Sequence, residues 1–239
     1  HVLDQCDVRV GDRIVALMPN IPGTVSAMLA TTARGAIWSS VSPEYGSDII
    51  IDRFGQLEPK VLITSVGHRY RGRMHGTFEK VENIQNSIPS IKNTILVPYG
   101  WPPDTGCDGS ISNVTIFQTT KEIPDIPSCS FDRFPFNHPL FILFSSGTEG
   151  KPKCIIHGAG GTLLNQCKQH ALHTNLTDKD TLFFRTTTSW MMWNSLVSAL
   201  ATGAKIVLYD GDPLLRDGRI LFDIAQKEKI TVFGTSAGF

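Results

Sequence analysis

The segment from residue 140 to residue 156 constrains this chain most, because two apolar runs flank a loop suited to an anion. Residues 140–144 are all apolar and predict a buried strand, and residues 154–156 predict a second one. The loop between them contains short hydroxyl side chains, two glycines and two lysines: Ser145, Ser146, Gly147, Thr148, Glu149, Gly150, Lys151 and Lys153. Glycines let the backbone approach a ligand closely. Successive N–H groups form an anion-binding nest, so the pattern indicates a polyphosphate-binding loop.

The loop differs from the phosphate loop of nucleoside triphosphatases, whose motif is G-x-x-x-x-G-K-[ST]. Here Gly147 and Gly150 are only three positions apart, and Lys151 precedes Pro152. Residues 145–153 instead resemble the [ST]-[ST]-G-[ST]-[TE]-G-x-P-K signature of the adenylate-forming superfamily. That superfamily includes acyl-CoA synthetases, luciferases and the adenylation domains of nonribosomal peptide synthetases. Glu149 stands where the commonest form of the signature has Thr, and a Ser/Gly-rich surface turn is the alternative interpretation.

A second motif narrows the resemblance within that superfamily. Residues 189–194 are Ser-Trp-Met-Met-Trp-Asn, and this block resembles the branch that activates acetoacetate. The acetate-activating branch has a Gly-Trp-x-x-Gly-His pattern here, and Ser189 replaces the glycine expected before Trp190. The similarity extends over most of the chain, including residues 11–20 and 35–44.

The resemblance implies an ATP-dependent acid:CoA ligase that works through an acyl-adenylate. ATP, Mg²⁺ and, as a co-substrate, coenzyme A are the implied cofactors. The loop from Ser145 to Lys153 is expected to bind the β- and γ-phosphates, with Lys153 the better phosphate contact and Thr148 reaching Mg²⁺ through the bound nucleotide. Trp190, Met191 and Met192 are candidates for the acid pocket, with core packing as the alternative. We assign no catalytic residue within the chain, and Trp193 is expected in the core.

Two other functions stay open at this stage. One is an acetyl- or propionyl-CoA synthetase-like ligase, against which the block at residues 191–194 argues. The other is a non-catalytic nucleotide-binding fragment. The chain begins with His1 rather than Met, and we expect an internal fragment of a large N-terminal domain that is inactive alone. The resemblance places the ribose-binding acidic residue, the hinge and the catalytic lysine beyond Phe239.

Composition excludes some partners. The 22 basic and 22 acidic residues give a formal net charge of zero. The composition therefore lacks the excess of basic residues that attracts nucleic acid or an anionic membrane. Apolar runs are far shorter than a membrane span needs. The five cysteines follow no metal-ligand spacing, which favours a reducing compartment, the cytosol. We therefore expect small-molecule substrates and neither nucleic acid nor membrane as partners.

Hydrophobic periodicity predicts an α/β fold with two consecutive subdomains and largely parallel sheets. The first covers residues 1–98, a connector covers 99–137, and the second, with the phosphate loop, covers 138–239. Within the first, apolar residues from Tyr70 to Ile88 recur every three or four positions and predict one long helix. The basic residues at 68–73 are expected on a solvated face of that helix, with contact to CoA phosphates as the alternative.

Overall fold

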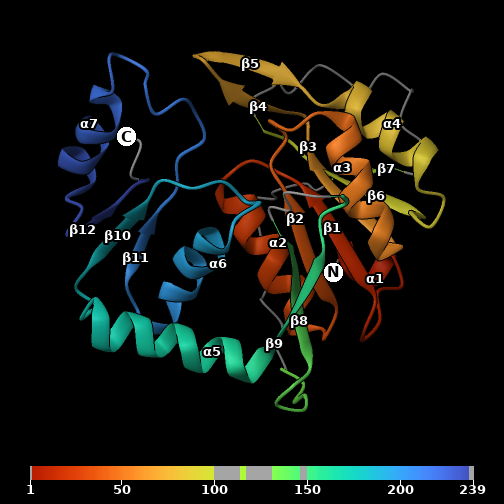
Figure 1. Ribbon diagram of the computed structural model, residues 1–239, viewed down its shortest axis with the longest axis horizontal. Coiled ribbons are helices and arrows are strands. Elements are labelled where there is room, and N and C mark those ends of the chain that lie inside the picture. Colours follow the sequence, from red (N-terminus) through yellow and green to blue (C-terminus); the bar gives the residue numbers. More distant parts are fainter. Residues whose placement is uncertain (1, 100–113, 117–130, 146–149, 237–239) are drawn as a thin grey trace.

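The computed structural model describes residues 2–99, 114–116, 131–145 and 150–236, and its elements are arranged around two main sheets (Figure 1). The larger sheet has seven strands in the order β7-β6-β3-β1-β2-β8-β9, all parallel except the β8–β9 pair. Its strands are β1 (Arg13–Leu17), β2 (Ile37–Val41), β3 (Val61–Ser65), β6 (Asn93–Val97), β7 (Val114–Ile116), β8 (Pro139–Phe144) and β9 (Cys154–Gly158). The predicted α/β class with largely parallel sheets is confirmed.

Helices cover both faces of the larger sheet, as its strand pattern requires. Alternate residues of a strand point to opposite faces, and β1 is buried on both, so it reads as a continuous apolar run. Ile14 and Ala16 pack with α2 (Pro22–Ala33), whereas Val15 and Leu17 pack with α3 (Ser47–Phe54) and α4 (Phe78–Ser87). The short elements α1 (Val2–Gln5) and η1 (Gly55–Leu57) complete these layers.

The smaller sheet follows the larger one along the chain and is entirely parallel. Its order is β11-β10-β12, with β10 at Thr181–Phe184, β11 at Lys205–Val207 and β12 at Val232–Gly234. The surrounding helices are α5 (Ala159–Lys168), the π-turn η2 (Gln169–His173), α6 (Met191–Ser198), η3 (Ala199–Thr202) and α7 (Arg219–Glu228). Helix α6 joins the two cores, because Trp193 and Val197 pack with the larger sheet while Leu196 packs with the smaller.

Two expectations are corrected by the topology. Strands β8 and β9, expected in the second subdomain, belong to the larger sheet, where Trp38 of β2 pairs with Phe141 of β8. The physical reason is that β8 buries Phe141 in one core and Ile142 in the other. The change from one sheet to the other therefore falls after Gly158 and does not coincide with residue 138.

The long helix predicted over residues 70–88 is wrong in its first half. Residues 67–76 form a hairpin of β4 (Gly67–Tyr70) and β5 (Arg73–Gly76), and α4 begins only at Phe78. The two-residue turn has positive φ at both Arg71 (49°) and Gly72 (73°). That combination is the type I′ turn, whose twist suits a hairpin and breaks a helix.

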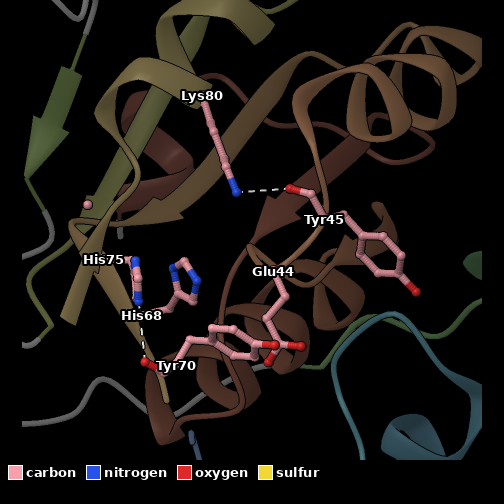
Figure 2. A pocket seen from close by; sticks show the side chains of 7 residues that line it. Glu44, Tyr45, His68, Tyr70, His75 and Lys80 are labelled. Atoms are coloured by element: carbon pink, nitrogen blue, oxygen red, sulfur yellow. Dashed lines mark hydrogen bonds between the residues drawn. The ribbon is translucent and has the colours of Figure 1, made fainter. Parts of the chain in front are cut away.

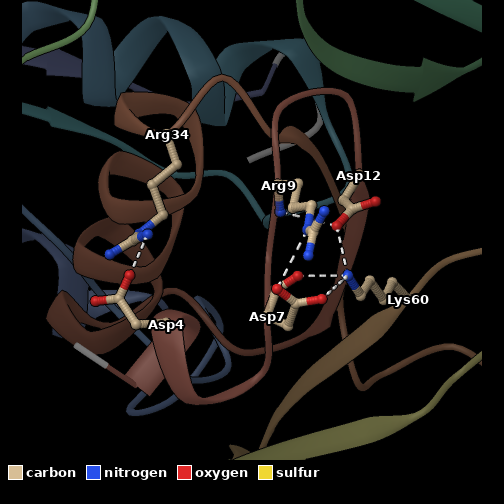
Figure 3. Close-up of polar contacts among 6 residues, drawn as sticks. All are labelled: Asp4, Asp7, Arg9, Asp12, Arg34 and Lys60. Carbon is tan, nitrogen blue, oxygen red and sulfur yellow. Dashed lines mark hydrogen bonds and ion pairs between the residues drawn. The ribbon is translucent and has the colours of Figure 1, made fainter.

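An ion cluster fastens the N-terminal segment to the larger sheet (Figure 3). The Lys60 ammonium donates to the Asp7 backbone carbonyl and to Asp12 Oδ2, the latter at 2.9 Å, and the Arg9 N–H donates to the same Asp12 oxygen. Burial alone would raise the pKa of Asp12, but the Lys60 and Arg9 hydrogen bonds outweigh burial and hold it below its ordinary value. Arg34 pairs with Asp4 nearby.

Substitution of two glycines, one at a time, can test how closely the segment before β8 packs on the larger sheet. Gly11 and Gly35 both have positive φ, but a Cβ on Gly35 would lie 2.5 Å from the Phe134 ring, whereas Gly11 faces open space. Gly35→Ala should therefore cost about 1–3 kcal/mol more unfolding free energy than the matched control Gly11→Ala, since overpacking adds to backbone strain. Denaturant unfolding of both variants measures the difference, and equal losses would contradict this packing.

Candidate functional site

The carboxyl ends of β1, β2 and β8 lie side by side at one edge of the larger sheet. The three strands are parallel neighbours, so the residues that follow them, 18–20, 42–44 and 145 onward, meet at the same edge. Ligands of open α/β sheets bind outside the carboxyl ends of the strands. Both motifs singled out in the sequence border this edge.

The base of the loop at residues 145–153, which the sequence predicts to bind phosphate, is closed by two hydrogen bonds between Ser145 and Lys153. The Ser145 N–H donates to the Lys153 carbonyl at 2.9 Å, and the Lys153 N–H donates to Ser145 Oγ at 3.0 Å. The hydroxyl of Ser145 thus shapes the loop by accepting a backbone hydrogen bond. Ser146, Gly147, Thr148 and Glu149 lie outside the described residues.

Lys151 and Pro152, in the second half of the loop, contact α3 and η1. Lys151 pairs with Asp52 at 3.3 Å, and the Gln56 side chain donates to the Pro152 carbonyl at 3.1 Å. Gly150 has φ of 75°, which favours glycine there. Within the described part of the chain, the exposed Lys153 ammonium makes no ion pair. Of the two loop lysines, Lys153 is therefore the more readily available to an anion.

The Trp-Met-Met-Trp segment is tied to the ends of β1 and β2. Thr188 Oγ1 donates to the Met18 carbonyl at 2.8 Å, and the Thr188 carbonyl accepts from Ser40 Oγ at 2.6 Å. The Ser42 N–H donates to Ser189 Oγ at 2.7 Å. Ser189, the departure from the expected glycine, therefore uses its hydroxyl to anchor the segment.

The side chains of this segment divide between core and surface. Trp193 is fully buried, donates from Nε1 to Asn20 Oδ1 at 2.9 Å, and stacks on Trp38 with ring centroids 6.4 Å apart. Met191 packs at the border of the larger core. Trp190 and Met192 are 53% and 40% exposed, respectively. The expectation that Trp193 is a core residue is confirmed, and the exposed pair leaves apolar surface available near the strand ends.

A cavity of about 480 Å³ lies between the β4–β5 hairpin and the residues that follow β2 (Figure 2). Lys80 of α4 donates to the carbonyls of Pro43 and Tyr45, which fixes the wall after β2. A second, polar cavity of about 20 Å³, enough for one water, adjoins the ends of both sheets. The larger cavity is lined by Glu44, Tyr45, His68, Tyr70, His75, Gly76 and Lys80.

Burial shifts the pKa values of three ionisable side chains that line the larger cavity: His68, Glu44 and Lys80. It is the main cause that lowers the pKa of His68 to about 4, assisted by Lys80 and His75, so this imidazole is neutral at pH 7. Burial also raises the pKa of Glu44 and lowers that of Lys80. The Nδ1 atom of His68 is buried and makes no hydrogen bond within the described residues. The described residues contain no group of three or more side chains suited to hold a metal ion.

The family model described as "AMP-binding enzyme" matches residues 1–237. The chain belongs to this family. The adenylate-forming resemblance carried by residues 145–153 is thereby confirmed.

The chain is similar to acetoacetyl-CoA synthetases over nearly all of its length. It is 44% identical over 233 residues to the enzyme of Mus musculus and 46% identical over 232 residues to that of Rhizobium meliloti (strain 1021). These alignments cover 96% and 97% of the chain but 35% of each enzyme. A solved acetoacetyl-CoA synthetase from Streptomyces lividans superimposes with a TM-score of 0.89 at 40% identity, over 99% of this chain and 35% of that one. The fold is therefore that of part of an adenylate-forming enzyme, as predicted.

The cavity beside the hairpin is the part of the candidate site that sequence reasoning missed. His68 and His75 face each other across the hairpin, with ring centroids 5.6 Å apart, because their positions pair in its register. The Arg71-Gly72 pair between two short segments could have indicated a hairpin turn. The apolar residues around it are spaced as in a helix, however, and this spacing favoured the helix prediction. The described residues contain no helix long and apolar enough to cross a membrane.

The neutral state of His68 predicts acid sensitivity. In the unfolded chain this side chain titrates near 6.5, so between pH 6.5 and about 4 the unfolded state binds more protons than the folded state. Stability should therefore fall as pH drops through this window and be unaffected by His68 above it. His68→Gln should reduce the difference between Tm at pH 7 and at pH 5, and a His68 ring that titrates near 6.5 by NMR would contradict the assignment.

Proposed function

We propose that the full-length protein is an ATP-dependent acid:CoA ligase whose acid is acetoacetate. The chain spans about a third of the length of the acetoacetyl-CoA synthetases it matches, 35% in each alignment, so this activity is a proposal for the whole protein. The observation that carries it is the placement of two motifs at one sheet edge. The loop between β8 and β9 and the segment before α6 both border the carboxyl end of β2.

In the first half-reaction, a carboxylate oxygen of the acid attacks the α-phosphorus of ATP, which yields acyl-adenylate and pyrophosphate. Crowded negative charge is the main barrier, so the protein contributes positioning and electrostatic stabilisation. We assign the β- and γ-phosphates to the loop from Ser145 to Lys153, with ATP entering as its Mg²⁺ complex. The Lys153 ammonium, which is exposed and makes no ion pair within the described residues, supports this role. Thr148, the candidate Mg²⁺ contact, lies outside the described residues.

In the second half-reaction, the thiol of CoA attacks the acyl carbon and displaces AMP. We assign the CoA phosphates to the arginines of the β4–β5 hairpin. Arg69, Arg71 and Arg73 are exposed on a short hairpin beside the 480 Å³ cavity. Guanidinium groups bind phosphate through paired hydrogen bonds. This placement favours the CoA-contact interpretation of residues 68–73 over the solvated helix face.

The acid pocket is assigned to Trp190, Met191 and Met192. An aromatic ring and thioethers provide an apolar wall suited to a short acyl chain. The exposure of Trp190 and Met192 at the strand ends supports the assignment, since core packing would bury them. Release of pyrophosphate from ATP by the full-length protein, with acetoacetate, acetate or propionate added, tests the proposal. Preference for acetate or propionate would favour the rival ligase, and nucleotide binding without release would favour a non-catalytic role.

Lys153→Ala should impair use of MgATP. Loss of a charged hydrogen bond costs about 1.5–3 kcal/mol, so kcat/KM for ATP should fall at least tenfold. Lys151→Ala is the matched control, because Lys151 already pairs with Asp52, and it should have a smaller effect. Unchanged ATP kinetics in the Lys153 variant would refute the loop assignment.

Met191→Ala and Met192→Ala should change the choice of acid. One methylene of pocket fit is worth about 1–3 kcal/mol, so the ratio of kcat/KM for acetoacetate to that for longer acids should shift about tenfold. Leu196→Ala is the control, since Leu196 lies in the same helix and is a fully buried apolar residue of the smaller core. If the methionine variants alter only thermal stability, both side chains serve packing alone.

A further inference from the structure

Asp210 reaches from the smaller sheet to the hairpin that walls the larger cavity. It follows β11, and its Oδ2 accepts the backbone N–H of Arg69 in β4 at 2.8 Å. The carboxylate also interacts electrostatically with Tyr99, which follows β6: burial first, and the Asp210 charge next, raise the pKa of Tyr99 to about 12. Burial raises the pKa of Asp210, while the bonds from Arg69 and Tyr99 act in the opposite direction. One carboxylate therefore contacts two separate elements of the first half of the chain.

The hairpin register explains why Arg69 needs an acceptor. Tyr70 pairs with Arg73 across the two-residue turn, and Arg69 pairs with Met74 next to it. In an antiparallel ladder, alternate pairs turn their N–H groups away from the partner strand. The N–H of Arg69 therefore lies on the outer side of β4, where Asp210 meets it.

The hairpin depends on such outside support. It forms a separate two-stranded sheet, and within the described residues neither strand pairs with the seven-stranded sheet. Isolated two-stranded hairpins are only marginally stable in water. The residues on either side of Arg69, His68 and Tyr70, both line the 480 Å³ cavity. A bond at Arg69 thus fixes the position of two cavity walls.

We propose that Asp210 is a positioning residue for the CoA-dependent half-reaction, holding β4 against the cavity through the backbone N–H of Arg69. This role rests on the proposed ligase function and on the assignment of CoA to the hairpin. Asp210 lines the small polar cavity with Thr186 and Thr187, but within the described residues it makes no hydrogen bond to Ser145, Lys153 or residues 190–192. Its loss should therefore affect the step that uses CoA and spare the formation of acyl-adenylate.

Asp212 provides a matched control. Its Oδ1 accepts the N–H of Leu214 at 2.9 Å, a contact within its own loop. Asp212→Ala removes a carboxylate two residues from Asp210 without removing a described hydrogen bond to the hairpin. Asp210→Asn keeps a side-chain oxygen able to accept from Arg69 and serves as the conservative rescue.

The experiment compares these variants in the full-length protein by two measurements. In Asp210→Ala, the KM for CoA should rise about tenfold, as expected for loss of a charged hydrogen bond, while acetoacetate-dependent pyrophosphate release without CoA stays within about twofold. Amide hydrogen exchange in residues 67–76 should become faster in the same variant. Asp210→Asn should restore most of both properties, and Asp212→Ala should resemble the wild type.

The outcomes separate this role from the proposed function. Wild-type protein that releases no pyrophosphate with any acid overturns the ligase assignment and this proposal with it. Wild-type release, combined with unchanged hydrogen exchange of residues 67–76 in Asp210→Ala, overturns the positioning role alone. An equal loss of pyrophosphate release and CoA-dependent turnover in that variant also overturns it, because the defect would then be general.

Discussion

The buried hydrogen bonds between the segment before α6 and the ends of β1 and β2 are the contacts on which the rest of the arrangement depends. Thr188 bonds to the Met18 carbonyl and to Ser40, and the Trp193 indole bonds to Asn20. A buried polar group left without its partner costs about 1–3 kcal/mol, so these pairs allow few alternative positions. They fix the smaller sheet against the carboxyl edge of the larger one.

The two sides of the candidate site, the loop after β8 and the β4–β5 hairpin, are held in place differently. The phosphate loop is held at its base by Ser145 and Lys153 and leaves the Lys153 ammonium exposed. Within the described residues, the hairpin pairs with neither larger sheet, and it is held by Asp210 of the smaller sheet and by the Ser65 hydroxyl, which donates to the Gly67 carbonyl. Because one of these contacts comes from the smaller sheet, the shape of the cavity depends on how the two sheets are placed.

Prediction from sequence succeeded where local pattern and tertiary packing agreed. The strands predicted at residues 140–144 and 154–156 are present as β8 and β9. It failed at residues 70–76, where helical spacing of Tyr70 and Met74 was coincidental and the positive φ angles at the turn decided for a hairpin. In α5, the apolar side chains of Leu163 and Leu164 are exposed. Apolar periodicity indicates that a segment is helical, but which face of that helix becomes buried depends on elements distant in the sequence.

The sequence by itself determined the α/β class, the Ser/Gly-rich loop between two strands and the resemblance to adenylate-forming enzymes. These properties reside in short runs of residues, where strand propensity, glycine conformation and side-chain chemistry act locally. Only the tertiary structure decided that β8 joins the larger sheet, that His68 is buried and neutral, and that Asp210 meets Arg69. Arg69 and Asp210 are 141 positions apart in the chain. Such contacts arise when whole sheets pack together, and no local pattern encodes them.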